Sequence, residues 1–192
     1  MSGETEALAA RLERFRAYLQ LLARVHLAPR LRGKVDLSGV VQQTLWEGHR
    51  ALGASPPPDD AQPAALLRRL LANNLADEVR KCYADKRDAG RERSLDAALE
   101  ESSARLEALL AADQSSPEQR AGRNEELLRL AGALERLPEA QRQAVELHYL
   151  RGWRLEEIAN HLGRGKSAVA GLLHRGLDKL REFLRLPNRD DS

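Results

Sequence analysis

The chain has 192 residues, of which 42% are hydrophobic and 31% charged, and its formal net charge is +2. This length allows two small domains or one medium domain with a hydrophobic core, and the near balance of charges excludes a uniformly basic protein. Aromatic residues make up only 4%, with leucine and alanine in their place, which favours helical bundles over sheets.

Several classes of function lack their characteristic residues in this chain. The single cysteine, Cys82, excludes an internal disulfide and a thiolate zinc cluster. The histidines do not occur at zinc-helix spacings, and no phosphate-binding loop, dinucleotide-binding glycine motif or nucleophile elbow is present. We therefore expect a protein that is not an enzyme and that binds no metal or other cofactor.

No apolar run reaches the roughly 20 residues that cross a bilayer, and the beginning of the chain lacks a signal-peptide core. We therefore expect a cytoplasmic protein without membrane insertion.

The first part of the chain predicts three amphipathic helices. The first covers about residues 5–27, where Phe15 and a series of leucines recur at steps of three and four. Asp36 is a plausible N-cap for the second, over residues 40–52. Four prolines in residues 53–63 predict a loop, and the third helix follows over about residues 64–83. Its outward cations are expected to be Arg68, Arg69, Arg80 and Lys81.

Two adjacent asparagines, Asn73 and Asn74, lie in the middle of the third helix, where asparagine is a poor helix former. One interpretation is a tolerated polar pair on the surface. The other is an amide pair beside a basic face that forms hydrogen bonds with base edges. The sequence leaves both open.

The composition changes over residues 84–122, where charges, small residues and Ser115-Ser116-Pro117 predict a linker with a short helix around residues 99–110. Helical periodicity then returns at residues 127–137, and Pro138 opens a further helix. The predicted fold class is all-α, with two small helical domains joined by a flexible linker. The expected boundaries are residues 1–88, a linker at 89–122, a second domain at 123–187 and a polar tail at 188–192.

Residues 155–181 have the pattern of a helix-turn-helix. Ala159 supplies the small residue that close helix crossing requires, and Gly163 supplies a residue that tolerates positive φ at the corner. Apolar residues at helical spacing are expected to face a shared core: Leu155, Ile158, Leu162, Val169 and Leu172. An ordinary helical hairpin would explain the leucines but not the paired alanine and glycine, so we favour a DNA-binding motif.

Positive charge is concentrated behind this motif. Seven Lys or Arg and two acidic residues lie between Arg164 and Arg189, although the whole chain has a net charge of only +2. Such a concentration is expected where phosphates are met, and the first turn of the second helix is small and polar, as close approach to bases requires.

Residues 134–181, LERLPEAQRQAVELHYLRGWRLEEIANHLGRGKSAVAGLLHRGLDKLR, resemble region 4 of the bacterial sigma-70 family. Residues 34–50, KVDLSGVVQQTLWEGHR, and 66–88, LLRRLLANNLADEVRKCYADKRD, are similar to region 2 of the same family. The short interval between the two regions resembles the extracytoplasmic-function subfamily. The mixture of motifs resembles the sets found in planctomycete-type bacteria.

The resemblance implies a sigma factor, which binds core RNA polymerase, directs it to promoters and promotes DNA melting. The loop over residues 53–63 would receive a flipped base. The minus-35 element would be read as duplex by Arg164, Lys166, Ser167, Ala170, Gly171, His174 and Arg175. The minus-10 element would be melted and read by Arg69, Asn73, Asn74, Asp77, Arg80 and Lys81. Core polymerase would be bound by Asp36, Val40, Val41, Gln42, Thr44, Leu45 and Trp46.

The expected partners are bacterial core RNA polymerase and promoter DNA, and an anti-sigma factor is a further partner that the resemblance suggests. Gly39 stands where the family usually has an acid, which favours an alternative: a two-domain helix-turn-helix regulator that does not act as a polymerase subunit. A third hypothesis treats the front domain as a bundle that binds an anti-sigma partner or a second copy.

Overall fold

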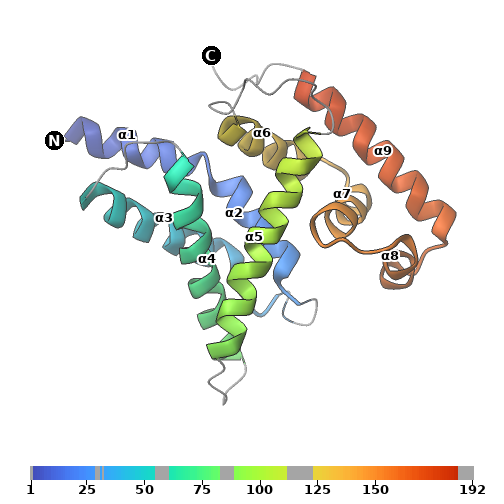
Figure 1. The fold of residues 1–192 in the computed structure, drawn as a ribbon, viewed down its shortest axis with the longest axis horizontal. Helices are drawn as coiled ribbons and strands as arrows, with labels where there is room; N and C mark the ends of the chain where they lie inside the picture. Colours follow the sequence, from blue (N-terminus) through green and yellow to red (C-terminus); the bar gives the residue numbers. More distant parts are fainter. Residues whose placement is uncertain are drawn as a thin grey trace.

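The computed structural model describes residues 2–28, 31, 33–54, 61–82, 89–111 and 123–185. Within these ranges the chain forms helices and no β-strand, which confirms the predicted all-α class (Figure 1). None of the described helices is both long enough and apolar enough to span a membrane.

The first predicted helix is two helices, α1 (Ser2–Glu13) and α2 (Arg16–His26). The chain turns between them, and the Phe15 amide donates to the Leu12 carbonyl at 3.0 Å. Leu12 and Phe15 are both buried beside this turn. The apolar periodicity continues across the break, so the prediction of one continuous helix was wrong.

Helix α2 lies at the centre of the molecule. It packs against α3 (Leu37–Ala54), α4 (Ala61–Cys82), α5 (Ala89–Ala111), α6 (Arg123–Glu135) and the π-helical turn η2 (Glu146–Leu150). Its side chains with 0% exposure include Tyr18, Leu19, Leu21, Leu22 and Ala23. A helix buried on so many sides is expected in the middle of a core rather than on its surface.

Helices α3 and α4 match the second and third predicted helices, with shifted ends. Asp36 caps α3 as predicted, because its Oδ1 accepts the Gly39 amide at 3.0 Å. Helix α4 begins earlier than expected, so Pro63 belongs to its first turn, where proline is tolerated, and not to the predicted loop. Residues 55–60 of that loop lie outside the described residues.

Residues 89–111 form the helix α5 where a linker was expected. Leu99 and Leu106 are fully buried on it, and Ser102 and Ser103 between them are also buried. Helix α5 packs against α4, α2, α6 and η2 (Figure 1). Serines and alanines dilute the apolar stripe of this helix, which explains why the sequence predicts only a short helix. The remaining linker residues, 112–122, lie outside the described residues, and the domain boundaries stay a prediction.

The C-terminal part of the described chain contains α6, α7 (Glu139–Val145), η2, α8 (Leu155–Leu162) and α9 (Lys166–Arg185). Pro138 is the residue that caps α7, as its sequence position predicts. Helix α7 continues into η2, where the Arg151 amide donates to the Glu146 carbonyl at 3.2 Å, the i to i+5 spacing of a π-helix.

Two glycines inside helices provide a matched test of packing. A β-carbon at Gly48 in α3 would lie 2.6 Å from Leu67 Cδ2 of α4, and Leu67 is fully buried. A β-carbon at Gly132 in α6 would meet nothing within 4 Å. We expect Gly48→Ala to lower the free energy of unfolding by about 1–3 kcal/mol through overpacking. Gly132→Ala should raise it by up to about 1 kcal/mol through helix propensity.

Denaturant unfolding of the two variants checks this expectation. Equal stability of Gly48→Ala and Gly132→Ala would contradict the close approach of α3 and α4.

His26, at the end of α2, connects α2 to α5 and, through Ser102, to η2. Its Nε2 lies 2.8 Å from the Ser102 Oγ on α5, and that hydroxyl donates to the Leu150 carbonyl at 3.0 Å. Since the serine uses its only hydrogen on Leu150, Nε2 of His26 must carry the proton that it donates. Burial, and next the positive charge of Arg151, lower the pKa of His26 to about 4 against the opposing effect of Glu101.

This lowered pKa predicts a pH-dependent stability. The folded state holds His26 neutral. The stability that neutral His26 contributes is therefore complete above about pH 6.5 and is lost as pH falls towards 4. The loss amounts to about 3 kcal/mol at most. The free energies of unfolding of the parent chain and of His26→Gln, whose side chain does not titrate, should therefore approach each other as pH falls from 7 to 4. A constant difference between the two free energies over this range would contradict the assignment.

Candidate nucleic-acid interface

Helices α8 and α9 form the predicted helix-turn-helix, and Gly163 makes its corner with φ of +62°. The Arg164 amide donates to the Ala159 carbonyl at 2.9 Å, and the Gly163 amide to the Asn160 carbonyl at 3.4 Å. This pair of bonds is a Schellman motif, which ends a helix at a left-handed residue. Glycine adopts that conformation without the steric cost of a β-carbon.

Both helices have a defined start. The Arg154 amide donates to Glu157 Oε2 at 2.7 Å, which satisfies one of the free amides at the beginning of α8. Gly165 precedes α9, and its carbonyl accepts the Val169 amide at 3.1 Å. The turn and the two caps thus fix where the second helix begins.

The predicted core of the motif is confirmed for Ile158, Val169 and Leu172, which are buried, and Ala159, the predicted small residue at the crossing, is also buried. Leu162 is half-buried. Leu155 is 36% exposed, so the prediction that it faces the core was wrong. Leu155 is the first residue of α8 and lies at the edge of the packed face.

The start of α9 faces outward. Of the residues predicted to read the minus-35 element, Gly171 is half-buried and the following are exposed: Arg164, Lys166, Ser167, Ala170, His174 and Arg175. We call the exposed part of this set the α9 reading face. Its side chains are mostly small or cationic, which suits the floor and the phosphate walls of a DNA groove.

Three of these side chains have neighbours within the chain. Lys166 Nζ lies 3.1 Å from Glu156 Oε1, and His174 Nδ1 lies 3.0 Å from Asp178 Oδ2. The Arg175 guanidinium folds over Gly171, where a β-carbon would lie 3.1 Å from its Nη1. An exposed ion pair contributes about 1 kcal/mol or less, so Lys166 can exchange Glu156 for a phosphate at little cost.

The predicted minus-10 residues lie on α4 and are not equivalent. Arg69, Asn73, Asp77 and Lys81 are exposed, and Arg80 is half-buried. Arg80 pairs with Asp77, and Lys81 pairs with Glu78. These side chains line up along the helix at steps of three and four, and they form a polar face that we call the α4 face.

Asn74 differs from its neighbour Asn73. Its side-chain amide donates to Thr44 Oγ1 at 3.2 Å and to Glu47 Oε2 at 3.0 Å, both on α3. In this arrangement Asn74 ties α4 to α3, a role that neither interpretation of the sequence included. Asn73 has the exposed position from which an amide can reach a base.

The residues predicted to bind polymerase divide into two groups on α3. Val40, Val41, Thr44 and Leu45 are buried and hold α3 against its neighbours, whereas Asp36, Gln42 and Trp46 are exposed. Trp46 is 52% exposed, and the Arg50 guanidinium lies 4.7 Å from its ring centre. Any partner that docks on α3 in this arrangement meets the second group.

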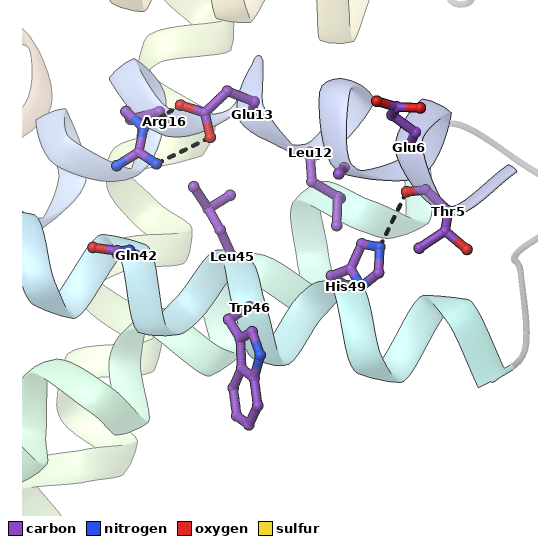
Figure 2. Close-up of a pocket in the computed structure, with 10 residues that line it drawn as sticks. Thr5, Glu6, Leu12, Glu13, Arg16, Gln42, Leu45, Trp46 and His49 are labelled. Carbon is purple, nitrogen blue, oxygen red and sulfur yellow. Dashed lines mark hydrogen bonds and ion pairs between the residues drawn. The ribbon is translucent and has the colours of Figure 1, made fainter. Parts of the chain in front are cut away.

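A groove of about 750 Å³ runs between α1 and α3 beside this exposed group. Figure 2 shows Leu45 directed towards α1 and Trp46 extending from α3 away from α1. His49 Nε2 on α3 donates to the Thr5 carbonyl of α1 at 3.2 Å and closes one end of the groove. Glu13 and Arg16 pair with each other near its other end.

Sequence reasoning missed the polar residues that join helices. Arg68 was expected to face outward, but its guanidinium donates to both carboxylate oxygens of Glu100 on α5 and to the Tyr18 hydroxyl. Glu146 is buried with its carboxylate on Arg24. A weak sequence signal for the inward contacts of Arg68 exists, since Arg68 directly follows Leu67, which is buried. We find no sequence signal for Glu146.

A helix-turn-helix with an exposed, cationic start of its second helix defines a DNA-binding domain of that class. Residues 127–180 match the family model described as Sigma-70, region 4. The match extends from α6 into α9 and contains α8, the turn and α9 as far as Leu180, so the chain carries a domain similar to region 4 of sigma-70 factors. None of the curated proteins compared with the chain matches it.

The α9 reading face generates a positional prediction. Arg164→Ala and Lys166→Ala should each weaken duplex binding by about tenfold, because each removes a cation at or just before the start of α9, the end that is predicted to enter the groove. Lys179→Ala removes the same charge from a half-buried position more than three turns further along α9 and should have a much smaller effect.

Fluorescence anisotropy with labelled promoter DNA, repeated at several salt concentrations, measures these effects. A loss for Lys179→Ala equal to that for Lys166→Ala would contradict the assignment of the reading face to the start of α9.

Proposed function

We propose that this protein is a sigma factor of the extracytoplasmic-function type, which binds core RNA polymerase, directs it to promoters and promotes DNA melting. The observation that supports this proposal best is the α9 reading face, which lies on a helix-turn-helix within the segment similar to sigma-70 region 4. The protein itself would carry out no catalysis, and it would act in the cytoplasm, where polymerase and DNA meet.

In this proposal the α9 reading face and the α4 face read DNA in different forms. The α9 reading face enters the major groove of the minus-35 duplex, where each base pair presents a distinct pattern of donors and acceptors. The α4 face contacts the minus-10 element as it opens. Asn73 and Arg69 are the exposed amide and cation on that face, and they suit contacts with a separated strand and its phosphates.

Melting costs a few kcal/mol for each base that leaves its stack, and binding of the opened strand must offset this cost. The α4 face offers cations and the Asn73 amide but no aromatic side chain, so hydrogen bonds and phosphate contacts supply the compensation. Contact at two separate elements adds effective concentration, which lets two individually weak contacts select one promoter.

Core polymerase would dock on the exposed residues of α3. Trp46 offers the largest exposed apolar surface there, and aromatic side chains often contribute most to protein interfaces. Asp36 and Gln42 add polar contacts at its side. The buried Val40, Val41, Thr44 and Leu45 would position α3 and would not touch the partner directly. An anti-sigma factor would have to compete for the same exposed surfaces.

Run-off transcription with purified bacterial core polymerase and a promoter library tests this function. We expect defined start sites only in the presence of the chain. Trp46→Ala should reduce transcription and polymerase binding by at least about tenfold, because it removes a central aromatic contact, and should leave the affinity for duplex DNA unchanged. Lys166→Ala should have the opposite pattern, with weakened duplex binding and intact polymerase binding.

Failure to produce start sites, together with retained duplex binding, would contradict the sigma proposal. That result would instead support a helix-turn-helix regulator that does not act as a polymerase subunit. Footprinting then separates the two by the shape of the site, because a dimeric regulator protects a symmetric site and a sigma factor protects two unlike elements.

A further inference from the structure

A pocket of about 200 Å³ lies where the end of α2 meets η2 and α8, and we call it the η2 pocket. None of the residues that are proposed above to contact DNA or polymerase lines it. Its walls have an apolar part and a polar part, which include Leu27, Leu147 and Trp153 and, respectively, His26, Glu146 and Arg151. A dry cavity of about 150 Å³ is large enough for benzene, so the η2 pocket has room for one substituted ring.

The apolar walls suit a flat occupant. Leu27 and Leu147 are buried, and the Trp153 amide donates to the Leu147 carbonyl at 3.0 Å, which holds the tryptophan beside η2. The Trp153 ring stands edge-on to the ring of His161 on α8, with their centres 5.3 Å apart. Aliphatic and aromatic walls of this kind favour an aromatic ring, because it makes many dispersion contacts and loses little conformational entropy.

Two polar atoms of the lining residues are acceptors with capacity left. Nε2 of His26 donates to Ser102, so the neutral ring keeps Nδ1 as an acceptor. Glu146 Oε1 accepts two bonds from Arg24, at 3.1 and 2.8 Å, whereas Oε2 accepts none within the described part of the chain. An occupant that brings a hydrogen can therefore satisfy an acceptor that the protein leaves open.

The charges of the walls favour an uncharged occupant. Among the described residues that line the pocket, Glu146 is the one carboxylate and Arg151 the one guanidinium. Burial lowers the pKa of His26 to about 4, so this histidine is neutral at pH 7. A charged ligand would lose its hydration without meeting a net opposite charge. Within the described ranges, no group of His, Cys, Asp and Glu could hold a metal ion instead.

We propose that the η2 pocket is a binding site for an uncharged, single-ring aromatic molecule with a hydrogen-bond donor, of which phenol is the simplest. The ring packs against Leu147 and Trp153, and its hydroxyl donates to Nδ1 of His26. Glu146 Oε2 is the acceptor for a second donor on the ring. Because His161 belongs to α8, the occupant also lies beside the first helix of the helix-turn-helix. This site does not depend on the sigma function proposed above.

Tryptophan fluorescence tests the site with two matched chains. The sequence has two tryptophans, so Trp46→Phe leaves Trp153 as the reporter at the η2 pocket. Trp153→Phe leaves Trp46 as the reporter at the groove between α1 and α3. Phenol should change the first signal saturably with a Kd of about 1 mM, as expected for about seven non-hydrogen atoms, and should not saturate the second. Equal changes at both tryptophans, or no saturable change at Trp153, would overturn the site.

Ligands of similar size test the chemistry of the occupant in the Trp46→Phe chain. At pH 7 phenol is uncharged, since a phenolic hydroxyl has a pKa of about 10, whereas benzoate is an anion and benzylamine a cation. Both ions should bind at least about tenfold more weakly than phenol. Binding of either ion as tight as that of phenol would contradict the assignment of an uncharged occupant.

Two further substitutions in the same chain separate space from hydrogen bonding. Ala28→Phe adds a ring at a half-buried position of the pocket wall and should abolish phenol binding. His26→Phe keeps a ring but removes the acceptor. It should therefore lower the affinity for phenol relative to toluene, which has no donor, by about threefold to tenfold. Circular dichroism verifies that both variants keep their helices. Undiminished phenol binding to folded Ala28→Phe, or an unchanged ratio in His26→Phe, would overturn the proposal.

Discussion

The burial of helix α2 is the constraint on which the rest of the arrangement depends. Its side chains face neighbours on nearly every side, so the polar groups that it carries must find partners inside the protein. The Tyr18 hydroxyl donates to Ser103 Oγ at 2.9 Å and accepts from Arg68, while burial raises its pKa. The Val25 carbonyl near the end of the helix accepts a hydrogen bond from Arg151. The neighbouring helices are thus joined by the polar requirements of α2 as well as by its apolar surface.

The helix-turn-helix could be predicted from the sequence because local constraints determine it. A left-handed corner needs a glycine, and a close helix crossing needs a small residue. Both requirements appear in the sequence as particular residue types at a fixed spacing, here Ala159 and Gly163. The start of α9 follows from the same turn. For that reason the exposure of Arg164 and Lys166 was predictable, although their contacts with DNA remain a prediction.

The packing between distant segments could not be predicted in the same way. Helix α5 carries Ser102 and Ser103 in the middle of its buried face, and serine in a sequence favours a loop as much as a helix interface. These serines are buried because Tyr18 and Leu150 supply their partners, which lie about 50 to 85 residues away in the chain. The break between α1 and α2 was also hidden, since the apolar periodicity does not change there.

The π-helical turn η2 has a consequence for how this architecture tolerates insertions and deletions. A π-helical turn holds one residue more than an α-helical turn over the same hydrogen-bonded span. Loss of one residue from 146–150 would therefore convert the turn to ordinary α-helix and leave the direction of the following residues nearly unchanged. Loss of one residue from the α-helical turns of α7 would instead rotate everything that follows by about 100°. The turn is thus the place before α8 and α9 where a change of one residue in length should disturb their direction least.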